Sequence, residues 1–290
     1  MKNTSLTIII ALFIASTLTA GGPWPQPKGK GYFKLSEWWT VFDQHFTDAG
    51  LKDPNVTTGI FNTSFYGAYG VTDRFTVILN GPLLSRNYMN NLRSGTTEEI
   101  IVEGEAINTI GDFDLGLQYG LRKPGVQVPV SLTLVLGLPT GNPSGGTQGN
   151  LQTGDGEFNQ MLQLDAGSGF SVGKLPAYVS AYVGFNNRTN DFSEEFRYGV
   201  ELGVGLFNKK LWLATKLNTV ESLKNGATAE TVTSTSLFAN NTEFMSLSIE
   251  ANYYVTKRLG LSVSAAGALR GEIIAAAPSY SVGVFYDLSK

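Results

Sequence analysis

Two short groups of residues in this sequence have the types and spacing of a nucleophilic or general-base site. Residues 169–173 read GFSVG and match the G-x-S-x-G pattern that carries a catalytic serine on a strand-to-helix turn. That chemistry needs a histidine after the serine, whereas the single histidine, His45, precedes it. We therefore interpret residues 169–173 as part of a turn rather than as a nucleophile elbow.

The second group is Asp43 and His45 taken together with Asp112 and Asp114, because these residue types suit acid–base chemistry. A histidine oriented by an aspartate can activate water as a general base. Barrel proteases of the outer membrane use such a pair opposite two carboxylates, and barrel phospholipases need a serine beside the histidine. Here Thr47 is the nearest hydroxyl at that spacing. We therefore assign no catalytic residue, and a barrel hydrolase is kept only as the third-ranked functional alternative.

Asp155 and Glu157 are the remaining candidate ligands, because carboxylates near backbone carbonyls suit Ca²⁺. Their surroundings lack an EF-hand pattern and are rich in glycine, so we expect a solvated loop tip there. The chain has no cysteine and one histidine, which excludes disulfides and thiolate metal sites and disfavours a histidine zinc site. The sequence contains no cofactor motif, and no basic patch favours nucleic acid as a partner.

The amino-acid composition indicates which kind of secondary structure must position any site in this chain. Of 290 residues, 34 are glycine and 16% are charged, and the aromatic residues include 17 Phe and 12 Tyr. Charged residues make up about 25% of an ordinary soluble domain. A low charge content with many glycines and aromatics is typical of a β-rich chain with much surface outside water.

Residues 1–20 have the features of a secretory signal peptide. Lys2 is followed by an apolar centre and a small, polar end. We therefore predict export, with residues 21–290 forming the mature domain.

Apolar and polar residues alternate along many segments of that domain. In residues 111–121, GDFDLGLQYGL, Leu115 and Leu117 belong to one parity and Asp114 and Gln118 to the other. Because successive side chains of a strand point to opposite faces, each strand has an oily face and a polar face. Twelve strands are predicted, at residues 31–42, 57–69, 74–84, 109–121, 126–138, 157–166, 176–187, 196–206, 211–221, 242–254, 259–269 and 278–288.

The predicted connections alternate in length. Short turns lie at residues 70–73, 122–125, 207–210 and 255–258, with a somewhat longer one at 167–175. Long loops lie at residues 43–56, 85–108, 139–156, 188–195, 222–241 and 270–277. This alternation is the pattern of an outer-membrane barrel. The predicted fold is all-β, a transmembrane antiparallel barrel of about twelve strands in an up-and-down meander.

Two observations favour the membrane over a soluble β-sandwich or lipocalin-like barrel, which remains the alternative. Charged residues such as Glu201, Lys216 and Glu250 lie at mid-strand in the polar parity, and a sheet in lipid must close on itself to satisfy its backbone. Aromatic residues near strand ends are expected to form interface girdles, and these are Trp38, Trp39, Tyr69, Tyr119, Trp212, Tyr253 and Tyr286.

The strand at 111–121, the segment LTLVLGLPTG at 132–141 and the loop end LQTGDGE at 151–157 resemble a known group of proteins. They are similar to the outer-membrane proteins named for the MetA pathway of phenol degradation, and the turn YGVTDRF at 69–75 is similar to the hairpins of that group. The resemblance covers roughly residues 60–290. It implies a barrel that transports small organic molecules, with no catalytic residues to carry over.

The predicted function is passive transport or binding of a small solute through a polar lumen in the cell outer membrane. The expected partners are outer-membrane lipid, the solute and a protein at the extracellular loops, and no cofactor is expected. The alternative is a non-conducting accessory barrel that binds a partner protein. The predicted lumen-lining residues are Lys34, Ser36, Asn62, Ser64, Asn80, Asp112, Asp114, Gln118, Thr133, Gln163, Asp165, Arg197, Glu201, Lys216, Asn218, Ser248, Glu250 and Asn252.

Overall fold

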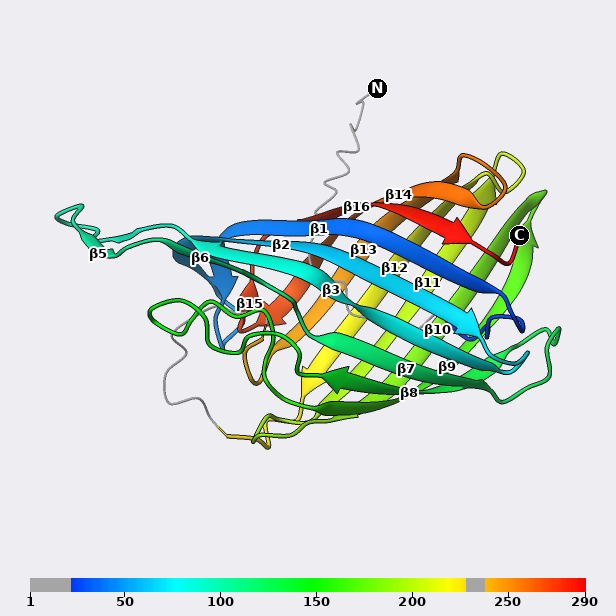
Figure 1. Cartoon of the computed structure of the whole chain (residues 1–290), viewed down its shortest axis with the longest axis horizontal. Helices are drawn as coiled ribbons and strands as arrows, with labels where there is room; N and C mark the ends of the chain where they lie inside the picture. Colours follow the sequence, from blue (N-terminus) through cyan, green and yellow to red (C-terminus); the bar gives the residue numbers. More distant parts are fainter. Residues whose placement is uncertain (1–21, 228–237) are drawn as a thin grey trace, which may run out of the picture.

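A computed structural model describes residues 22–227 and 238–290. The predicted signal peptide, residues 1–20, lies outside the described residues. The described chain forms one antiparallel sheet that curves until its two edges meet (Figure 1). Among the described residues, no helix is long and apolar enough to cross a membrane.

The barrel wall is built from long strands in chain order. They are β1 (Gly31–Phe46), β2 (Lys52–Gly70), β3 (Phe75–Met89), β6 (Glu105–Thr109), β7 (Phe113–Gly120), β8 (Val130–Leu138), β9 (Asn159–Val172), β10 (Leu175–Asn187), β11 (Glu195–Leu206), β12 (Leu211–Ser222), β13 (Glu243–Tyr254), β14 (Leu259–Glu272) and β16 (Ser279–Asp287). The short strands are β4 (Leu92–Arg93), β5 (Ile100–Val102) and β15 (Ile274–Ala275).

The order of the strands confirms the predicted meander of twelve. Each wall strand pairs with its neighbours in sequence, and β1 pairs with both β2 and β16, which closes the sheet. Strands β6 and β7 occupy one position in the wall, because both pair with β3. A closed sheet leaves no unpaired edge, which is the condition for crossing lipid.

The predicted strand at 109–121 is interrupted. The ladder between β3 and its partner stops between Asn80 and Ser85, and β6 and β7 flank a gap at residues 110–112. Pro82 lies within this part of β3 and has no backbone N–H to donate, although its carbonyl accepts a bond of 3.0 Å from Gly111 N. The proline therefore accounts for the break.

Two predicted connections are shorter than expected. Strand β9 continues to Val172 and β10 begins at Leu175, so the turn consists of Gly173 and Lys174. Gly173 has a φ of +62°, which a glycine adopts without strain. The G-x-S-x-G motif therefore lies mostly in a strand, and only its last glycine lies in a turn. Likewise, β1 and β2 extend to leave a connection of residues 47–51 instead of 43–56.

The predicted loop at residues 85–108 is largely a hairpin. Strands β3 and β6 continue past the barrel rim and carry the small β4–β5 hairpin at their far end (Figure 1). This segment projects away from the lumen. The predicted loop at 222–241 lies partly outside the described residues.

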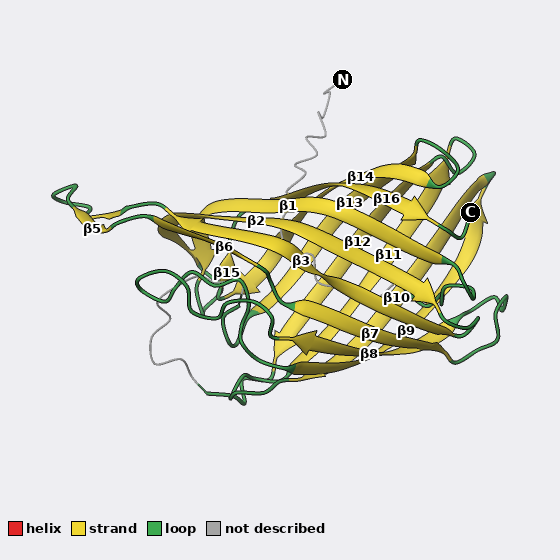
Figure 2. Cartoon of the chain, viewed as in Figure 1, coloured by secondary structure: helices red, strands yellow, loops and turns green. Residues whose placement is uncertain are grey.

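The sheet has an oily outer face and a polar inner face. Val200 and Val263 are outward and exposed, at 44% and 54% of their surface, whereas Gln118, Gln163 and other polar side chains are buried inside. A soluble barrel would place the oily face inside, so the orientation predicted for a membrane barrel is the observed one. Figure 2 shows that strands form nearly all of this wall.

The predicted aromatic girdle is partly wrong. Tyr69, Tyr119, Tyr253 and Tyr286 are exposed on the outer face, and Trp39 lies on the same face beside Tyr280. Trp38 and Trp212 instead share the inner face, because their cross-strand partners are the polar residues Asn62 and Asn252. The face on which a side chain lies follows from its position in the strand alternation. The girdle residues were predicted from their nearness to strand ends instead.

Candidate functional site

The inner face of the barrel is the candidate site. Directly opposed residues share a face, and the register opposes Asn80 to Asp114, Thr133 to Gln163 and Glu201 to Lys216. The same register places the other predicted strand residues on this face, which are Lys34, Ser36, Asn62, Ser64, Gln118, Asp165, Arg197, Asn218, Ser248, Glu250 and Asn252. Asp112 lies in the gap between β6 and β7.

A row of alternating charges crosses the inner face. Lys34 Nζ lies 3.1 Å from Glu250, and Lys216 Nζ lies 3.5 Å from Glu250 and 3.2 Å from Glu201. The Tyr178 hydroxyl also donates to Glu201. Two cations thus compensate two anions, and the row carries no net charge. Lys216 joins β12 to its neighbours β11 and β13, whereas Lys34 on β1 reaches Glu250 past the intervening β16 and β14. Charges that pair in this way leave little field for a solute of either sign.

Aromatic rings extend this surface toward the short-turn end. Tyr32 stacks on Phe285 with ring centroids 5.4 Å apart, and Tyr254 meets Phe285 edge-on at 4.9 Å. Tyr66 meets Tyr32 edge-on at 6.1 Å. These aromatic residues were not among the predicted lumen-lining residues, although Tyr32 and Tyr66 have the parity of the predicted polar positions. Their rings give the lumen apolar contact area beside its charges.

The segment of residues 22–30, GPWPQPKGK, enters the barrel from the rim, where Gly29 N donates to Gly70 O, and its first five residues lie against the inner wall. Gln118 Nε2 donates to Gly22 O at 2.6 Å, and Gln26 N donates to Thr76 Oγ1 at 2.8 Å. Trp24 meets Tyr178 edge-on at 5.8 Å. Because Thr76, Gln118 and Tyr178 all face the lumen, the segment narrows the lumen near its short-turn end.

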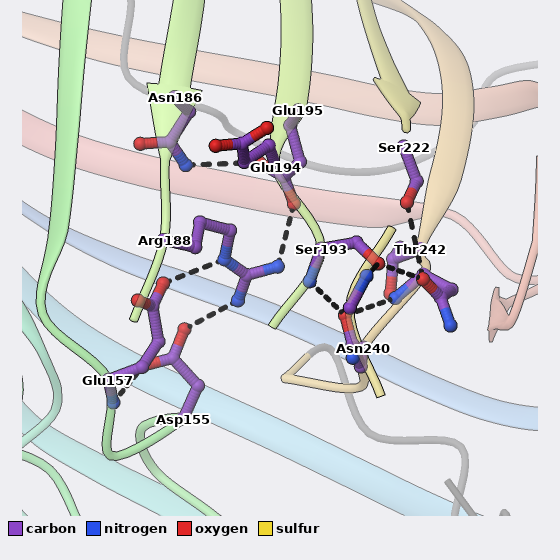
Figure 3. Close-up of polar contacts among 12 residues, drawn as sticks. Asp155, Glu157, Asn186, Arg188, Ser193, Glu194, Glu195, Ser222, Asn240 and Thr242 are labelled. Carbon is purple, nitrogen blue, oxygen red and sulfur yellow. Dashed lines mark hydrogen bonds and ion pairs between the residues drawn. The ribbon is translucent and has the colours of Figure 1, made fainter. Parts of the chain in front are cut away.

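Arg188 organises the opposite, long-loop end (Figure 3). Its guanidinium lies 3.0 Å from Asp155, 2.7 Å from Glu157 and 2.8 Å from Glu195. The Glu157 side chain is fully buried and Glu195 nearly so, and Glu195 also pairs with Arg197 at 2.5 Å. A guanidinium with its donors spread in one plane suits several carboxylates at once. This network ties the loop at 139–158 to the loop at 188–194.

The predicted solvated loop tip at Asp155 and Glu157 is therefore wrong. Both carboxylates are largely buried, and Arg188 occupies the position that a Ca²⁺ ion would need. No group of three or more His, Cys, Asp or Glu residues suited to a metal occurs in the described part of the chain. Arg188 and the Thr189 N–H, which donates to Glu157 at 2.9 Å, explain this burial, and the sequence offers no local signal that pairs them with residue 157.

Asp112 fixes the base of the same loop. Its carboxylate accepts hydrogen bonds from Gly141 N at 2.7 Å and from Asp155 N at 2.9 Å. Burial raises the pKa of Asp112 above its ordinary value, against the effect of these two bonds. Burial likewise raises the pKa of Asp155, and the nearby Asp112 adds to it while Arg188 opposes it. The two carboxyls thus hold protons more readily than exposed aspartates.

The hydrolase candidates are not assembled into a site. His45 opposes Asp53 of β2 and Ala275 of β15 at the long-loop end of β1. Asp114 lies on β7, which pairs with β3 and β8 and not with β1. Asp43 is exposed. Among the described residues, no helix follows Ser171, which lies in strand β9. The geometry therefore gives His45 neither the carboxylate pair nor the serine that the predicted chemistry requires.

The closed twelve-strand sheet, with its oily outer face and polar lumen, defines a transmembrane β-barrel of the outer-membrane class. The chain is similar in structure to an outer membrane channel of Pseudomonas putida F1, with a TM-score of 0.56 and 17% identity over 93% of this chain and 100% of that one.

Two further structures are more distant. The NanC porin gives a TM-score of 0.47 with 8% identity, over 88% of this chain and 98% of that one. The translocator domain of the autotransporter NalP from Neisseria meningitidis gives 0.48 with 12% identity, over 90% and 89%. No family model matches the chain, and no curated protein matches its sequence. At these identities the comparisons show the fold alone.

Proposed function

We propose that this protein is a passive outer-membrane channel for small solutes that are polar or aromatic. The observation that carries the proposal is the inner wall, where the neutral charge row of Lys34, Glu250, Lys216 and Glu201 lies close to the Tyr32–Phe285 ring stack. Paired charges lower the barrier for uncharged polar solutes, and aromatic rings offer weak contacts that a solute can leave. The predicted lumen residues line this path in the proposal.

The sequence resemblance to the phenol-degradation group supports a small organic solute within this proposal. The motifs that carry the resemblance are structural in this chain. Gly120 and Tyr119 end β7, and the segment at 139–141 begins the loop that Asp112 holds. The motifs therefore account for the fold of the barrel and leave the choice of solute to the inner wall. We propose no enzymatic activity.

Single-channel recording in planar bilayers tests the proposal. We expect a steady open current with weak selectivity between K⁺ and Cl⁻, because the charge row is balanced. Lys216→Gln leaves Glu201 and Glu250 with one cation, Lys34, and should shift the reversal potential toward cation selectivity. Lys257→Gln, in the short turn at 255–258, is the matched control and should leave the reversal potential unchanged. Electrical silence of the folded protein would contradict a channel.

The projecting hairpin favours a second candidate function, an accessory barrel that binds a protein. Leu92, Ile100 and Ile101 are exposed on β4 and β5, at 39%, 45% and 63% of their surface. Apolar side chains on a projecting hairpin suit a protein contact. Silence in the bilayer together with a stoichiometric protein that is lost on replacing Ile100 and Ile101 by serine would support this function instead.

A further inference from the structure

A small cavity lies on the inner wall where the N-terminal segment meets strands β9 to β12. Its volume is about 20 Å³, and its lining includes Gly22, Asp165, Ser180, Glu201 and Asn218. A single water needs about 10–15 Å³ measured in this way. The cavity therefore has room for one water or for one cationic group of similar size.

Asp165 is the residue in this cavity whose buried negative charge needs an explanation. Only 2% of its surface is exposed, and its Oδ1 accepts a hydrogen bond of 2.9 Å from Gln163 Nε2. Its Oδ2 has no hydrogen-bond partner among the described residues, and the ion pairs found there do not include Asp165. Burying an unpaired carboxylate is strongly unfavourable, so such a group either finds a cation or takes up a proton.

The cations of the inner wall are already engaged. Lys216 pairs with Glu201 and Glu250, and Lys34 pairs with Glu250. Arg197 pairs with Glu195. The cavity thus has carboxylates from Asp165 and Glu201 on its lining, and Glu201 alone is compensated. The Asp165 carboxylate therefore has no compensating cation among the described residues of this cavity.

The other lining groups suit a cation as well. Gly22, Ser180 and Asn218 also line this space, and each carries an oxygen atom of the kind that binds such a cation. Oxygen ligands with a single uncompensated carboxylate match a monovalent charge, and a multivalent metal prefers more anionic ligands. We propose that this cavity binds a monovalent cationic group of ammonium size, with Asp165 as its anionic partner.

The cation can come from two sources with the same chemistry. One is the α-ammonium group that removal of the predicted signal peptide leaves at the start of the mature chain, close in sequence to Gly22. The other is a free monovalent cation such as ammonium or potassium. The proposal is independent of solute conduction, because the cavity is smaller than any organic solute and lies under the N-terminal segment.

The experiment uses the exported, detergent-purified protein and Asp165→Asn, with Asp114→Asn as the control. Asp114 is another inward carboxylate, and it does not line the cavity. The unfolding temperature is measured in ammonium or potassium chloride against choline chloride at constant ionic strength. In parallel, reductive methylation followed by mass spectrometry compares the α-amine with Lys30, an exposed lysine near the same end of the mature chain.

The two sources give different results. A free cation raises the unfolding temperature of the wild type in a saturable manner and has no such effect on Asp165→Asn. An α-ammonium source gives no salt dependence, but the wild-type α-amine reacts at least about tenfold more slowly than in Asp165→Asn, because pairing keeps it protonated. Asp114→Asn should behave as the wild type in both assays.

Absence of salt dependence together with equal α-amine reactivity in both proteins would overturn the proposal and indicate a protonated Asp165. Ser180→Val keeps the carboxylate and fills the cavity, so it gives a second test if Asp165→Asn does not fold. It should remove the same cation effect or the same protection of the α-amine.

Discussion

Arg188 is the residue on which the long-loop end depends. Its guanidinium pairs with three carboxylates, two from the loop at 139–158 and one from the start of β11, and two of them are almost fully buried. Removing the cation would leave Asp155 and Glu157 without compensation in a place that water reaches poorly, whereas Glu195 would keep Arg197. The interactions of Arg188 are therefore worth more as a set than exposed ion pairs on the loops.

Arg188→Gln should lower the free energy of unfolding by about 3–5 kcal/mol, the usual cost of breaking a buried ion pair. Denaturant unfolding in detergent micelles, followed by tryptophan fluorescence, measures the change. Lys224→Gln is the control, because Lys224 pairs with Glu243 and Glu272 but is half exposed. It should cost at most about 1 kcal/mol. Equal losses for both variants would show that Arg188 has no special role.

The raised pKa values of Asp112 and Asp155 predict a pH dependence of stability. A carboxyl whose pKa is higher in the folded state favours folding at low pH, and this contribution falls as the pH rises from the unfolded pKa of about 4 through the folded value. Asp155→Asn should flatten that part of the stability profile, as measured by unfolding at closely spaced pH values. An unchanged profile would mean that Asp155 titrates normally.

At the scale of elements, the alternation of apolar and polar residues predicts the twelve positions of the wall, although β6 lies almost wholly in a segment predicted as a loop. Each strand buries one parity in the lumen and turns the other to lipid, so the pattern needs no long-range information. What the pattern misses depends on contacts between distant residues. Pro82 breaks the ladder of a neighbouring strand, and Arg188 buries carboxylates that follow residue 154.

The aromatic residues show a second limit. Trp38 and Trp212 were predicted to face lipid from their nearness to the ends of the predicted strands, but Trp38 lies in the middle of β1 and the parity of both places them inside. Proximity to a strand end is therefore a weaker guide than parity. Apart from Asp112, the predicted lumen residues share the inner face in the strand register, and Tyr32, Tyr66 and Tyr178 share it without having been predicted.

A charge on the outer face should be costly at mid-strand and tolerated at the rim. Val200→Arg should lower the free energy of unfolding in lipid vesicles by about 2–4 kcal/mol, because Val200 lies at the middle of β11. Phe207→Arg, in the short turn after β11, should cost about 0–1 kcal/mol. Similar effects at both positions would contradict a lipid-facing surface for this strand.

At the scale of the whole molecule, the barrel combines a closed wall with an ordered segment at each end. The Arg188 network orders the loops at one end, and residues 22–26 lie inside the other end. In the proposed channel, passage of a solute depends on these two ends and on the charged and aromatic inner face between them.

Trp24→Ala should raise the single-channel conductance, because Trp24 packs against Tyr178 within the lumen and its loss frees space there. Bilayer recording of the variant beside the wild type measures the change. Leu223→Ala, outside the lumen, is the control and should conduct as the wild type does. A conductance of Trp24→Ala equal to or below that of the wild type would show that residues 22–30 do not limit the path.

The central claim is that the oily face of the closed sheet meets lipid and the polar face meets water. The chain has no cysteine, so single cysteines give an unambiguous reading. Adjacent residues Val263 and Ser264 on β14 point to opposite faces. In proteoliposomes, a water-soluble methanethiosulfonate reagent should modify Ser264→Cys rapidly and leave Val263→Cys unmodified. Rapid modification of Val263→Cys with protection of Ser264→Cys would contradict the account.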